Sequence, residues 1–376
     1  MKKPLNPFIT SGYLSPEYFC DREIESEKLI KELINGNNVA LISTRRMGKT
    51  GLIQHCFSNP LIEQHYYTFF VDIYATKSLR DFVFSLSKVI LEGLKPYGKK
   101  ALEGFWNSLK SLQAGISFDA SGVPSFHAQL GDIHAAENTL EEIFYYLEKA
   151  GKHCFVAIDE FQQIANYPEK NVEALLRTKI QHCKNANFIF AGSQRNTLGK
   201  MFTASSRPFY QSVSVMHLES INIDRYVDFA CKHFKSYNRH IAPETVKSIY
   251  EMFDGITWYM QKVLNTLFIM TAPNKQMNDG ALEDAISSII DSYKYAYQET
   301  LFRLPEKQKE LLIAINKEGR ATGITSGNFV HKYKLPSASS VQSAIKSLLE
   351  KDYITFDQGE YFIYDRFLGL WLKENF

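Results

Sequence analysis

The sequence predicts an α/β fold in which a parallel-sheet core is followed by an all-helical unit and a C-terminal winged helix. Over the first 220 residues, short apolar runs of strand length alternate with helical patterns, which is typical of βαβ crossovers and a mostly parallel sheet. The strand patterns then stop, and the chain closes with three helices and a hairpin, the order of a winged helix-turn-helix. A length of 376 residues fits about two to three domains, which we place at residues 1–219, 220–303 and 304–376.

The expected strands of the core are all buried-looking runs, and helical patterns surround them. The strands are Asn38–Ser43, Tyr67–Ile73, Cys154–Ile158, Asn187–Ala191 and Ser212–Leu218, and the helices are Arg22–Asn35, Leu79–Leu94, Ala136–Lys149, Lys170–His182 and Thr197–Ala204. Asp21 is the expected N-cap of the first helix, and Gly36 its expected stop. Residues 115–130 interrupt the core, since Ile116–Ala120 and Pro124–Leu130 alternate apolar with polar residues and predict an inserted hairpin.

The second half of the chain is predicted to consist mainly of helices. Four helical patterns form the central unit, at Ile221–Phe234, Ala242–Phe253, Tyr259–Thr271 and Asp279–Leu301. The last unit has helices expected at 305–319, 326–333 and 337–352, the third opened by a Ser N-cap. Two strands are expected around Gln358 and Gly359, and a short amphipathic segment follows them.

Composition places the chain among ordinary globular proteins. Hydrophobic residues make up 45% and charged residues 22%, which excludes a disordered tail, a collagen-like fibre and a disulfide scaffold. Lys and Arg number 43 against 41 Asp and Glu, so any contact with nucleic acid must come from a local patch. The five cysteines form no C-x-x-C pair and predict reduced, mostly buried thiols. No apolar run approaches the ~20 residues of a membrane span, and residues 1–13 lack the apolar segment of a secretory signal. We therefore expect a cytoplasmic protein without membrane contact.

The strongest chemical signal is the segment Ser43–Thr50, which follows a strand and opens a helix. A phosphate loop needs backbone N–H groups and a helix N-terminus aimed at phosphate oxygens, a Lys for the β/γ-phosphates and a hydroxyl for Mg²⁺. Lys49 and Thr50 hold those two places, and Ser43 stands where the motif has its first glycine. The expected nucleotide-binding residues are Arg45, Arg46, Met47, Gly48, Lys49, Thr50 and Gly51. A Gly-Lys-Thr triplet that merely starts a helix is the alternative.

A second motif supports the first, because the apolar run Cys154–Ile158 leads directly into Asp159 and Glu160. Two acids at the carboxyl end of a parallel strand lie where such folds bind ligands. We expect Asp159 to help Thr50 hold Mg²⁺ and Glu160 to orient or deprotonate the attacking water. Together the motifs predict a P-loop ATPase with ATP and Mg²⁺ as its ligands.

These residues also resemble a known family, the archaeal-type P-loop ATPases near the STAND and AAA+ branches. The matching segments are Phe19–Glu23, Arg45–Thr50, Asp159–Gln162, Ala191–Ser193, and Asp365–Phe367 with Trp371. The resemblance extends over nearly the whole chain. It implies a P-loop NTPase core of the AAA+/STAND type, followed by an all-helical lid and a C-terminal winged helix.

The resemblance also implies roles for residues beyond the two motifs. Ser193, ahead of Gln194, would be a catalytic sensor of the γ-phosphate, although a Ser at a strand end is also an ordinary cap. Arg22 and Glu23 would lie near the adenine, or simply begin a helix. Residues 255–259 stand where related lids touch the nucleotide, with Thr257 in place of a proline.

Two further arginines are candidates for an arginine finger. Arg195 and Arg207 follow the fourth strand, and either could stabilise transition-state charge, in the same chain or from a neighbouring subunit of an oligomer. A structural arginine is the alternative for each. Arg45 and Arg46 could likewise touch phosphate or pair with nearby acids.

The winged helix leaves two kinds of partner open. Its third helix, Ser337–Lys351, could enter a DNA major groove through Ser339, Ser340, Gln342, Ser343 and Lys346. Residues 301–376 carry 11 Lys and Arg against 9 Asp and Glu, a small surplus for a DNA-binding domain. A protein partner or an autoinhibitory contact is therefore an equal alternative.

Two functional hypotheses follow. In the first, the core hydrolyses ATP and couples its nucleotide state to the winged helix. In the second, the chain is a nucleotide-gated DNA- or protein-binding switch with little or no hydrolysis. Glu160 favours the first hypothesis, whereas Ser43 and the lack of an obvious arginine finger favour the second.

Overall fold

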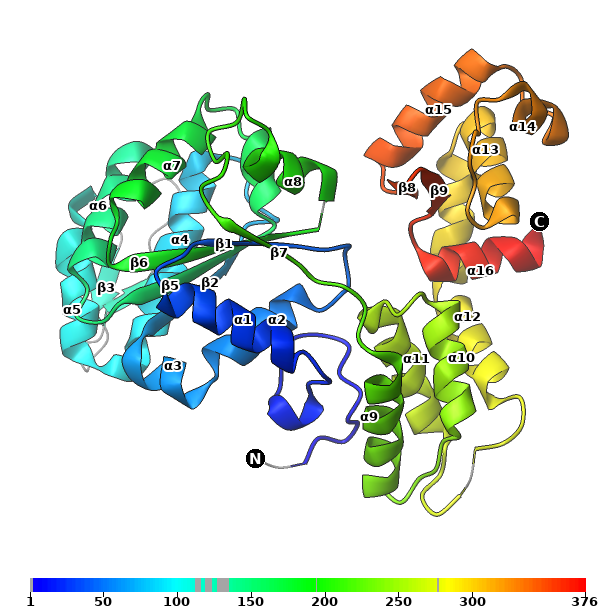
Figure 1. Cartoon of the computed structure of the whole chain (residues 1–376), viewed down its shortest axis with the longest axis horizontal. Helices are drawn as coiled ribbons and strands as arrows, with labels where there is room; N and C mark the ends of the chain where they lie inside the picture. Colours follow the sequence, from blue (N-terminus) through cyan, green and yellow to red (C-terminus); the bar gives the residue numbers. More distant parts are fainter. Residues whose placement is uncertain (1–2, 112–115, 119–123, 127–134, 194, 276) are drawn as a thin grey trace. The chain divides into compact units, whose positions relative to one another are not determined.

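The computed structural model describes residues 3–111, 116–118, 124–126, 135–193, 195–275 and 277–376 (Figure 1). It divides into two compact units. The sheet unit consists of Ile9–Tyr226 and Gly255–Trp258, and the C-terminal unit of Met1–Phe8, Val227–Asp254 and Tyr259–Phe376. Each unit is therefore assembled from segments that are far apart in the sequence.

The sheet unit contains a five-stranded sheet in the order β2-β5-β6-β1-β7, with every neighbouring pair parallel. The strands are β1 (Val39–Ile42), β2 (Tyr67–Asp72), β5 (Cys154–Asp159), β6 (Ala186–Gly192) and β7 (Ser214–His217). The five predicted strands are thus confirmed to within two residues at each end. Because all strands run in one direction, the carboxyl ends of β1, β5 and β6 share one edge of the sheet.

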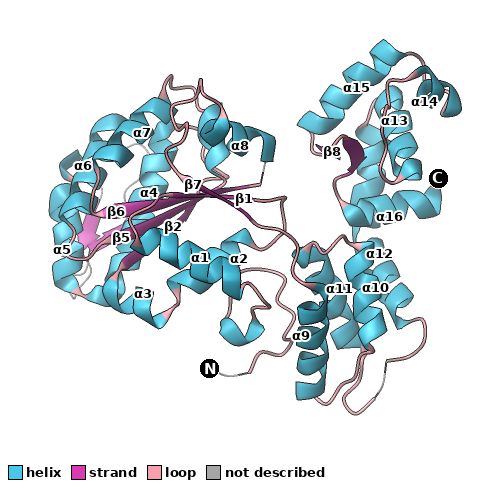
Figure 2. Ribbon diagram, in the orientation of Figure 1, coloured by secondary structure: helices cyan, strands magenta, loops and turns pink. Residues whose placement is uncertain are grey.

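Helices cover both faces of this sheet (Figure 2). Along β1, Val39 and Leu41 face one layer while Ala40 and Ile42 face the other, the alternation that a pleated strand imposes. The first layer is α1 (Glu23–Ile34), α2 (Lys49–Phe57) and α3 (Pro60–His65), and the second is α4 (Leu79–Leu94), α5 (Lys99–Ser108), α6 (Ala136–Lys149), α7 (Val172–His182) and α8 (Arg195–Thr203). The strands are thus buried on both sides, which explains their unbroken apolar runs.

The start of α1 differs from the prediction. Arg22 takes the N-cap position with φ 78°, and no side chain caps the helix. Asp21 is itself left-handed, at φ 54°, and its carboxylate accepts a hydrogen bond from the Asn222 N–H at 3.3 Å. Asp21 as N-cap was therefore wrong, because its side chain is used by a distant segment. Gly36, at φ 83°, follows the helix end as predicted.

The predicted insertion is partly described. Strands β3 (Ile116–Phe118) and β4 (Pro124–Phe126) pair antiparallel, as a hairpin requires. The remainder of residues 115–130 lies outside the described residues. Three short 3₁₀ turns, η1 (Pro16–Tyr18), η2 (Lys95–Tyr97) and η5 (Phe161–Asn166), complete the sheet unit as described.

The C-terminal unit contains a group of helices and the winged helix. The helices are α9 (Ile223–Ser236), α10 (Pro243–Met252), α11 (Thr257–Met270) and α12 (Ala281–Arg303). The winged helix has α13 (Glu306–Glu318), α14 (Gly327–Lys332), α15 (Ala338–Glu350), β8 (Ile354–Asp357) and β9 (Glu360–Ile363), and α16 (Arg366–Asn375) ends the chain. Ser337 caps α15 as predicted, since its hydroxyl accepts from the Ser340 N–H at 3.2 Å. The unit boundary falls inside α9 and α11.

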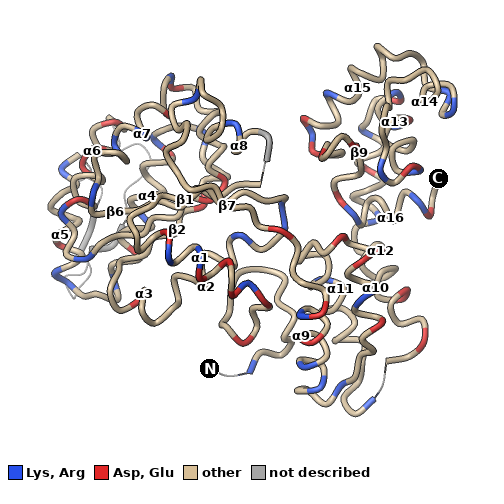
Figure 3. Tube along the Cα trace, in the orientation of Figure 1, with Lys and Arg blue, Asp and Glu red and all other residues tan. Residues whose placement is uncertain are grey.

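Surface charge is mixed along both units. Figure 3 shows basic and acidic positions interspersed on the helices of each unit. Four of the five cysteines are buried free thiols, and Cys231 is partly exposed. In the part of the chain that the structure describes, no helix combines the length and the apolar character needed to cross a bilayer.

Candidate nucleotide-binding site

The predicted phosphate loop is the turn between β1 and α2, at residues 43–48, all of which the structure describes. Within this turn the left-handed positions are Arg46, at φ 70°, and Gly48, at φ 92°. Gly48 occupies the N-cap position of α2, where a glycine adopts a positive φ without steric cost. Ser43 does not need that freedom. A serine at the motif's first glycine is therefore compatible with the turn.

Lys49 is held inside the loop by the residue that replaces that glycine. Its Nζ atom donates to Ser43 Oγ at 3.0 Å and to the Thr44 carbonyl at 3.2 Å, and the Ser43 hydroxyl donates to the same carbonyl at 2.8 Å. Ser43 is fully buried and Lys49 is 6% exposed. The serine hydroxyl thus positions the ammonium group, a contact that a glycine could not make.

The two motifs meet through Thr50 and Asp159. Thr50 Oγ1 donates to Asp159 Oδ2 at 2.6 Å, and the Glu160 N–H donates to Asp159 Oδ1 at 3.0 Å. Asp159 is 5% exposed. Its burial raises the pKa of the carboxyl group above its ordinary value, against the lowering effect of the Thr50 hydrogen bond. A hydroxyl and a carboxylate side by side are the hard oxygen ligands that Mg²⁺ prefers.

The donor set also fits how Mg²⁺ is bound in phosphate sites. Among the described residues there is no group of three or more His, Cys, Asp and Glu side chains that could hold a metal by themselves. Mg²⁺ is commonly held by one or two protein oxygens together with substrate phosphates and water. Thr50 and Asp159 supply such a pair.

Glu160 is fixed by contacts with Ser193, just after β6, and with Gln162, in the turn η5. Its backbone is left-handed, at φ 55°, a conformation that is uncommon outside glycine and occurs at functional sites. Its Oε2 atom accepts from Ser193 Oγ at 2.9 Å and from Gln162 Nε2 at 2.5 Å. Since β5 and β6 are neighbours, the structure brings Ser193 and Glu160 together.

Gln162 and Gly192 belong to the site although the motifs assigned them no role. Gln162 is 7% exposed, and its Oε1 atom has no hydrogen-bond partner. A Cβ atom built on Gly192 would lie 2.1 Å from that oxygen. The lack of a side chain at Gly192 therefore leaves the space that the Gln162 side chain occupies. Both residues stood within segments that match the resembled family, but their contact across strands is invisible in a sequence.

The loop arginines contact aromatic rings. The Arg45 guanidinium lies 5.6 Å from the Tyr74 ring centre, and that of Arg46 lies 4.3 Å from the Trp258 ring centre. Met47 is buried. Gly51 lies in the first turn of α2, and a Cβ there would come within 3.3 Å of the Phe19 ring. Arg45 and Arg46 thus have aromatic neighbours that hold the loop.

Residues 255–258 lie against the same loop. The Trp258 N–H donates to the Arg46 carbonyl at 3.1 Å, and Thr257 Oγ1 donates to the Met47 carbonyl at 3.4 Å. The Trp258 indole N–H donates to the Thr10 carbonyl at 3.0 Å. The segment that would touch the nucleotide in related lids therefore contacts the phosphate loop here.

The other candidate arginines have protein partners or fall outside the description. Arg207 pairs with Glu173 at the start of α7, and the side chain of Arg195, like the whole of Gln194, lies outside the described residues. Arg22 is buried and donates to Glu25 Oε1 and to the Glu219 carbonyl, each at 2.6 Å. The guanidinium of Arg22 therefore serves a structural contact.

Comparisons with known proteins identify the families that this chain matches. A family model described as "ATPase domain predominantly from Archaea" matches residues 19–263, and one described as "Probable winged helix domain" matches residues 295–374. A protein of Methanocaldococcus jannaschii is 22% identical over 375 residues, which cover 95% of this chain and 69% of that protein.

Solved structures share the fold over the whole chain. A Walker-type ATPase of Pyrococcus abyssi superimposes with a TM-score of 0.66 and 18% identity, covering 98% of this chain and 99% of that one. The ORC2 protein of Aeropyrum pernix, solved in complexes with ADPNP and ADP, gives a TM-score of 0.61 and 14% identity, covering 98% and 96%. With the family model matching well over half of its length, the chain belongs to the ATPase domain family found predominantly in archaea and carries a winged helix domain at its C-terminal end.

Proposed function

We propose that this protein hydrolyses ATP with Mg²⁺ and couples its nucleotide state to the winged helix. The observation that carries the proposal is the contact between the two motifs, with Thr50 Oγ1 2.6 Å from Asp159 Oδ2. A helix N-terminus, a buried lysine and a hydroxyl–carboxylate pair then converge at one edge of the sheet. This is the arrangement that binds a nucleoside triphosphate.

Each side chain of the site has a distinct task in this proposal. Lys49 leaves Ser43 and Thr44 to bind the β/γ-phosphates, which offer a charged partner in place of neutral oxygens. Thr50 and Asp159 hold Mg²⁺, which supplies charge stabilisation for the transferred phosphoryl group. Glu160 orients the attacking water and accepts its proton. Ser193, hydrogen-bonded to Glu160, keeps that carboxylate in place and faces the γ-phosphate.

A switch with little or no hydrolysis is the second candidate. One observation favours it: both Ser193 and Gln162 donate to Glu160 Oε2, so the base is already occupied. Arg207 also pairs within its own chain, which leaves Arg195 or a partner to supply any arginine finger. In this case the chain binds ATP and turns over only when a partner frees Glu160.

Glu160→Gln distinguishes the two candidates. For an ATPase, we expect phosphate release to fall about 10²–10⁴-fold because the general base is lost, while ATP binding persists. Glu137→Gln, at an exposed position of α6, is the matched control and should leave release unchanged. Phosphate release is measured with Mg²⁺ and ATP, and binding with a fluorescent ATP analogue. Release equal to that of the unchanged protein would remove Glu160 as the base.

The partner of the winged helix is proposed as DNA or a protein. Side chains on α15 that could reach DNA, namely Ser339, Gln342, Ser343 and Lys346, are exposed, which supports a docking face. Lys346 lies 3.9 Å from Glu350, so this face is not strongly basic. Measuring phosphate release with and without duplex DNA distinguishes the two kinds of partner. Release that rises when DNA is added favours a DNA partner, whereas unchanged release favours a protein partner.

A further inference from the structure

A six-residue segment, residues 254–259, follows α10, includes the first three residues of α11 and connects the two units of the molecule. Residues 255–258 belong to the sheet unit, whereas Asp254 and Tyr259 at its ends belong to the C-terminal unit. Asp254, at φ 52°, and Gly255, at φ 67°, are both left-handed. Consecutive residues in this conformation make a sharp turn at the boundary between the units.

Thr257 and Trp258 of the segment are hydrogen-bonded to the phosphate loop. Trp258 and Thr257 donate to the carbonyls of Arg46 and Met47, at 3.1 and 3.4 Å, and the Arg46 guanidinium lies over the Trp258 ring. Arg46 is the non-glycine residue of the loop with a positive φ. A change in the loop backbone at Arg46 or Met47 therefore alters the hydrogen bonds of this segment.

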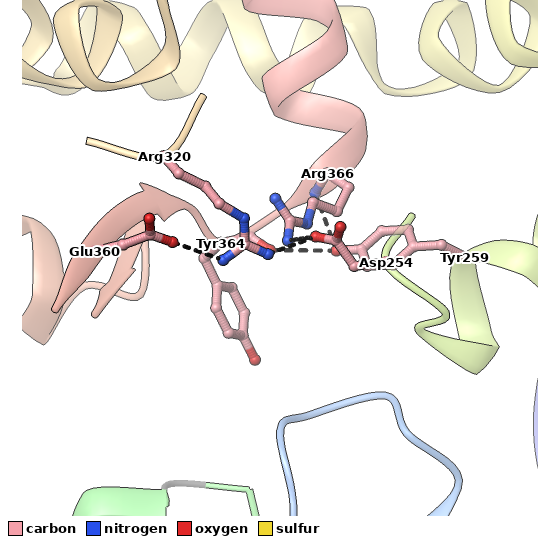
Figure 4. A network of polar contacts seen from close by, with 6 residues as sticks. All are labelled: Asp254, Tyr259, Arg320, Glu360, Tyr364 and Arg366. Carbon is pink, nitrogen blue, oxygen red and sulfur yellow. Dashed lines mark hydrogen bonds and ion pairs between the residues drawn. The ribbon is translucent and has the colours of Figure 1, made fainter. Parts of the chain in front are cut away.

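Asp254, the first residue of the segment, forms ion pairs with residues of the winged helix. The Asp254 carboxylate pairs with Arg320 at 3.0 Å and with Arg366 at the start of α16 (Figure 4). Arg320 also contacts Glu360 of β9 at 3.2 Å. The Arg366 side chain is 17% exposed, and its burial lowers the pKa of the guanidinium group, with Asp254 opposing that effect. Asp254 is thus the anion around which two cations of the winged helix are arranged.

The last residue of the segment makes a second connection to the same place. The Tyr259 hydroxyl accepts from the Arg366 backbone N–H at 3.2 Å and lies 3.5 Å from the Tyr364 carbonyl (Figure 4). Its buried ring packs edge-on against Phe367, with ring centres 5.2 Å apart. Both ends of the segment therefore contact α16 and the residues just before it.

We propose that residues 254–259 form a two-ended link that transmits the state of the phosphate loop to the winged helix, with Asp254 as its positioning residue. The link rests on the proposed function, because nucleotide must act on the loop. Six residues span at most about 20 Å even when fully extended, so a displacement at residues 257–258 reaches Asp254 and Tyr259 with little slack. The charged contacts then favour one arrangement of α16 over another, which is the differential interaction that a population shift requires.

Hydrogen exchange of the full chain, with and without Mg²⁺ and ADPNP, tests the link. In the unchanged protein we expect nucleotide to slow exchange in peptides of residues 43–57 and to change exchange at least twofold in peptides of residues 360–375. Asp254→Asn should keep the first response and lose the second. Glu299→Gln breaks an exposed ion pair on α12 and, as the matched control, should keep both.

A second variant covers the case in which Asp254→Asn does not fold. Arg320→Gln removes a half-exposed cation while Asp254 keeps Arg366, and it should at least halve the nucleotide response of residues 360–375. The link alone is overturned if nucleotide changes exchange in residues 43–57 of the unchanged protein but not in residues 360–375. It is also overturned if exchange in the Asp254→Asn protein responds to nucleotide as it does in the unchanged protein. A loop that does not respond to nucleotide overturns the proposed function, and the link with it.

Discussion

At the scale of single residues, the site depends on small side chains that fix large or charged ones. Ser43 holds the Lys49 ammonium, and Gly192 leaves room for Gln162, which in turn holds Glu160. Neither small residue is expected to touch the substrate chemistry itself. Substitutions at Ser43 or Gly192 should therefore change activity by displacing Lys49 or Glu160.

Gly192→Ala is the direct test of that dependence. The new Cβ would lie 2.1 Å from Gln162 Oε1 and 3.0 Å from Leu198 Cδ2, so Gln162 must move away from Glu160. We expect a loss of about 1–3 kcal/mol in the free energy of unfolding from overpacking. Phosphate release should fall more than nucleotide binding, because the loop itself is untouched. Urea unfolding and phosphate release measure the two effects.

Gly199→Ala is the matched control for this variant. Nothing lies within 4 Å of a Cβ at Gly199, in the interior of α8. Alanine there should stabilise the protein by about 0.5–1 kcal/mol through a better helix propensity. If both variants kept full phosphate release, the contact of Gln162 with Glu160 would have no role in turnover.

The residues of the proposed site could be identified from the sequence, whereas the residues that support them could not. Lys49, Thr50, Asp159 and Glu160 stand in local patterns that the type of element and its order reveal. The Ser43–Lys49 bond could not be predicted, because the sequence shows that a serine replaces the glycine but not what its hydroxyl contacts. Contacts such as Gln162 with Gly192 depend on the order of strands in the sheet, which no local spacing encodes.

At the scale of elements, the start of α16 is held by contacts from its own cap and from Asp254 and Tyr259. Its N-cap, Asp365, accepts hydrogen bonds from the Phe367 and Leu368 N–H groups at 3.0 and 3.4 Å. The next residue is Arg366, whose side chain and backbone N–H contact Asp254 and Tyr259. The cap therefore fixes the turn that presents Arg366.

Asp365→Ala should remove this cap. We expect the free energy of unfolding to fall by about 0.5–2 kcal/mol, as for other N-cap losses. Asp365→Asn is the control, since its amide oxygen still accepts both bonds and should cost little. Urea unfolding followed by circular dichroism gives the comparison. Equal losses in the two variants would show that charge, and not capping, is what Asp365 contributes.

Elements were predictable where their pattern is long, and less so where it is short. The helices of the C-terminal unit lie within two residues of their predicted ends, and all of them except the six-residue α14 carry more than two turns of apolar periodicity. The six-residue α3 and the weakly apolar α5 went unpredicted, because α3 is under two turns long and α5 buries only Leu102 and Phe105. The Asp21 cap was wrong because a tertiary contact outweighed the local preference.

At the scale of the whole molecule, the chain has two units, each with buried hydrophobic residues of its own. Only the sheet unit contains the phosphate loop. A ligand that binds one folded unit stabilises that unit by mass action. Nucleotide should therefore stabilise the sheet unit more than the C-terminal unit.

Calorimetry of the full chain should show two thermal transitions, and Mg²⁺ with ADPNP should raise one of them more than the other. At a hundred times the dissociation constant, the gain of about 2.7 kcal/mol corresponds to an increase of about 5 °C or more in the Tm of the sheet unit. Lys49→Ala should abolish the shift by removing the phosphate contact. A single transition that moves as a whole would contradict the division into units.

The interleaving of the two units has a consequence for biosynthesis. Phe8 is fully buried, with ring centres 5.2 Å from Phe234 and 6.0 Å from Phe268. At translation rates of about 5–20 residues per second, Phe8 leaves the ribosome roughly 10–50 s before Phe268 is made. The phosphate loop must likewise wait for residues 255–258, which complete its unit. A nascent chain stalled before residue 255 would thus carry the full Lys49 motif without the residues that contact it, and Phe8 would lack one of its ring neighbours until residue 268 has been made.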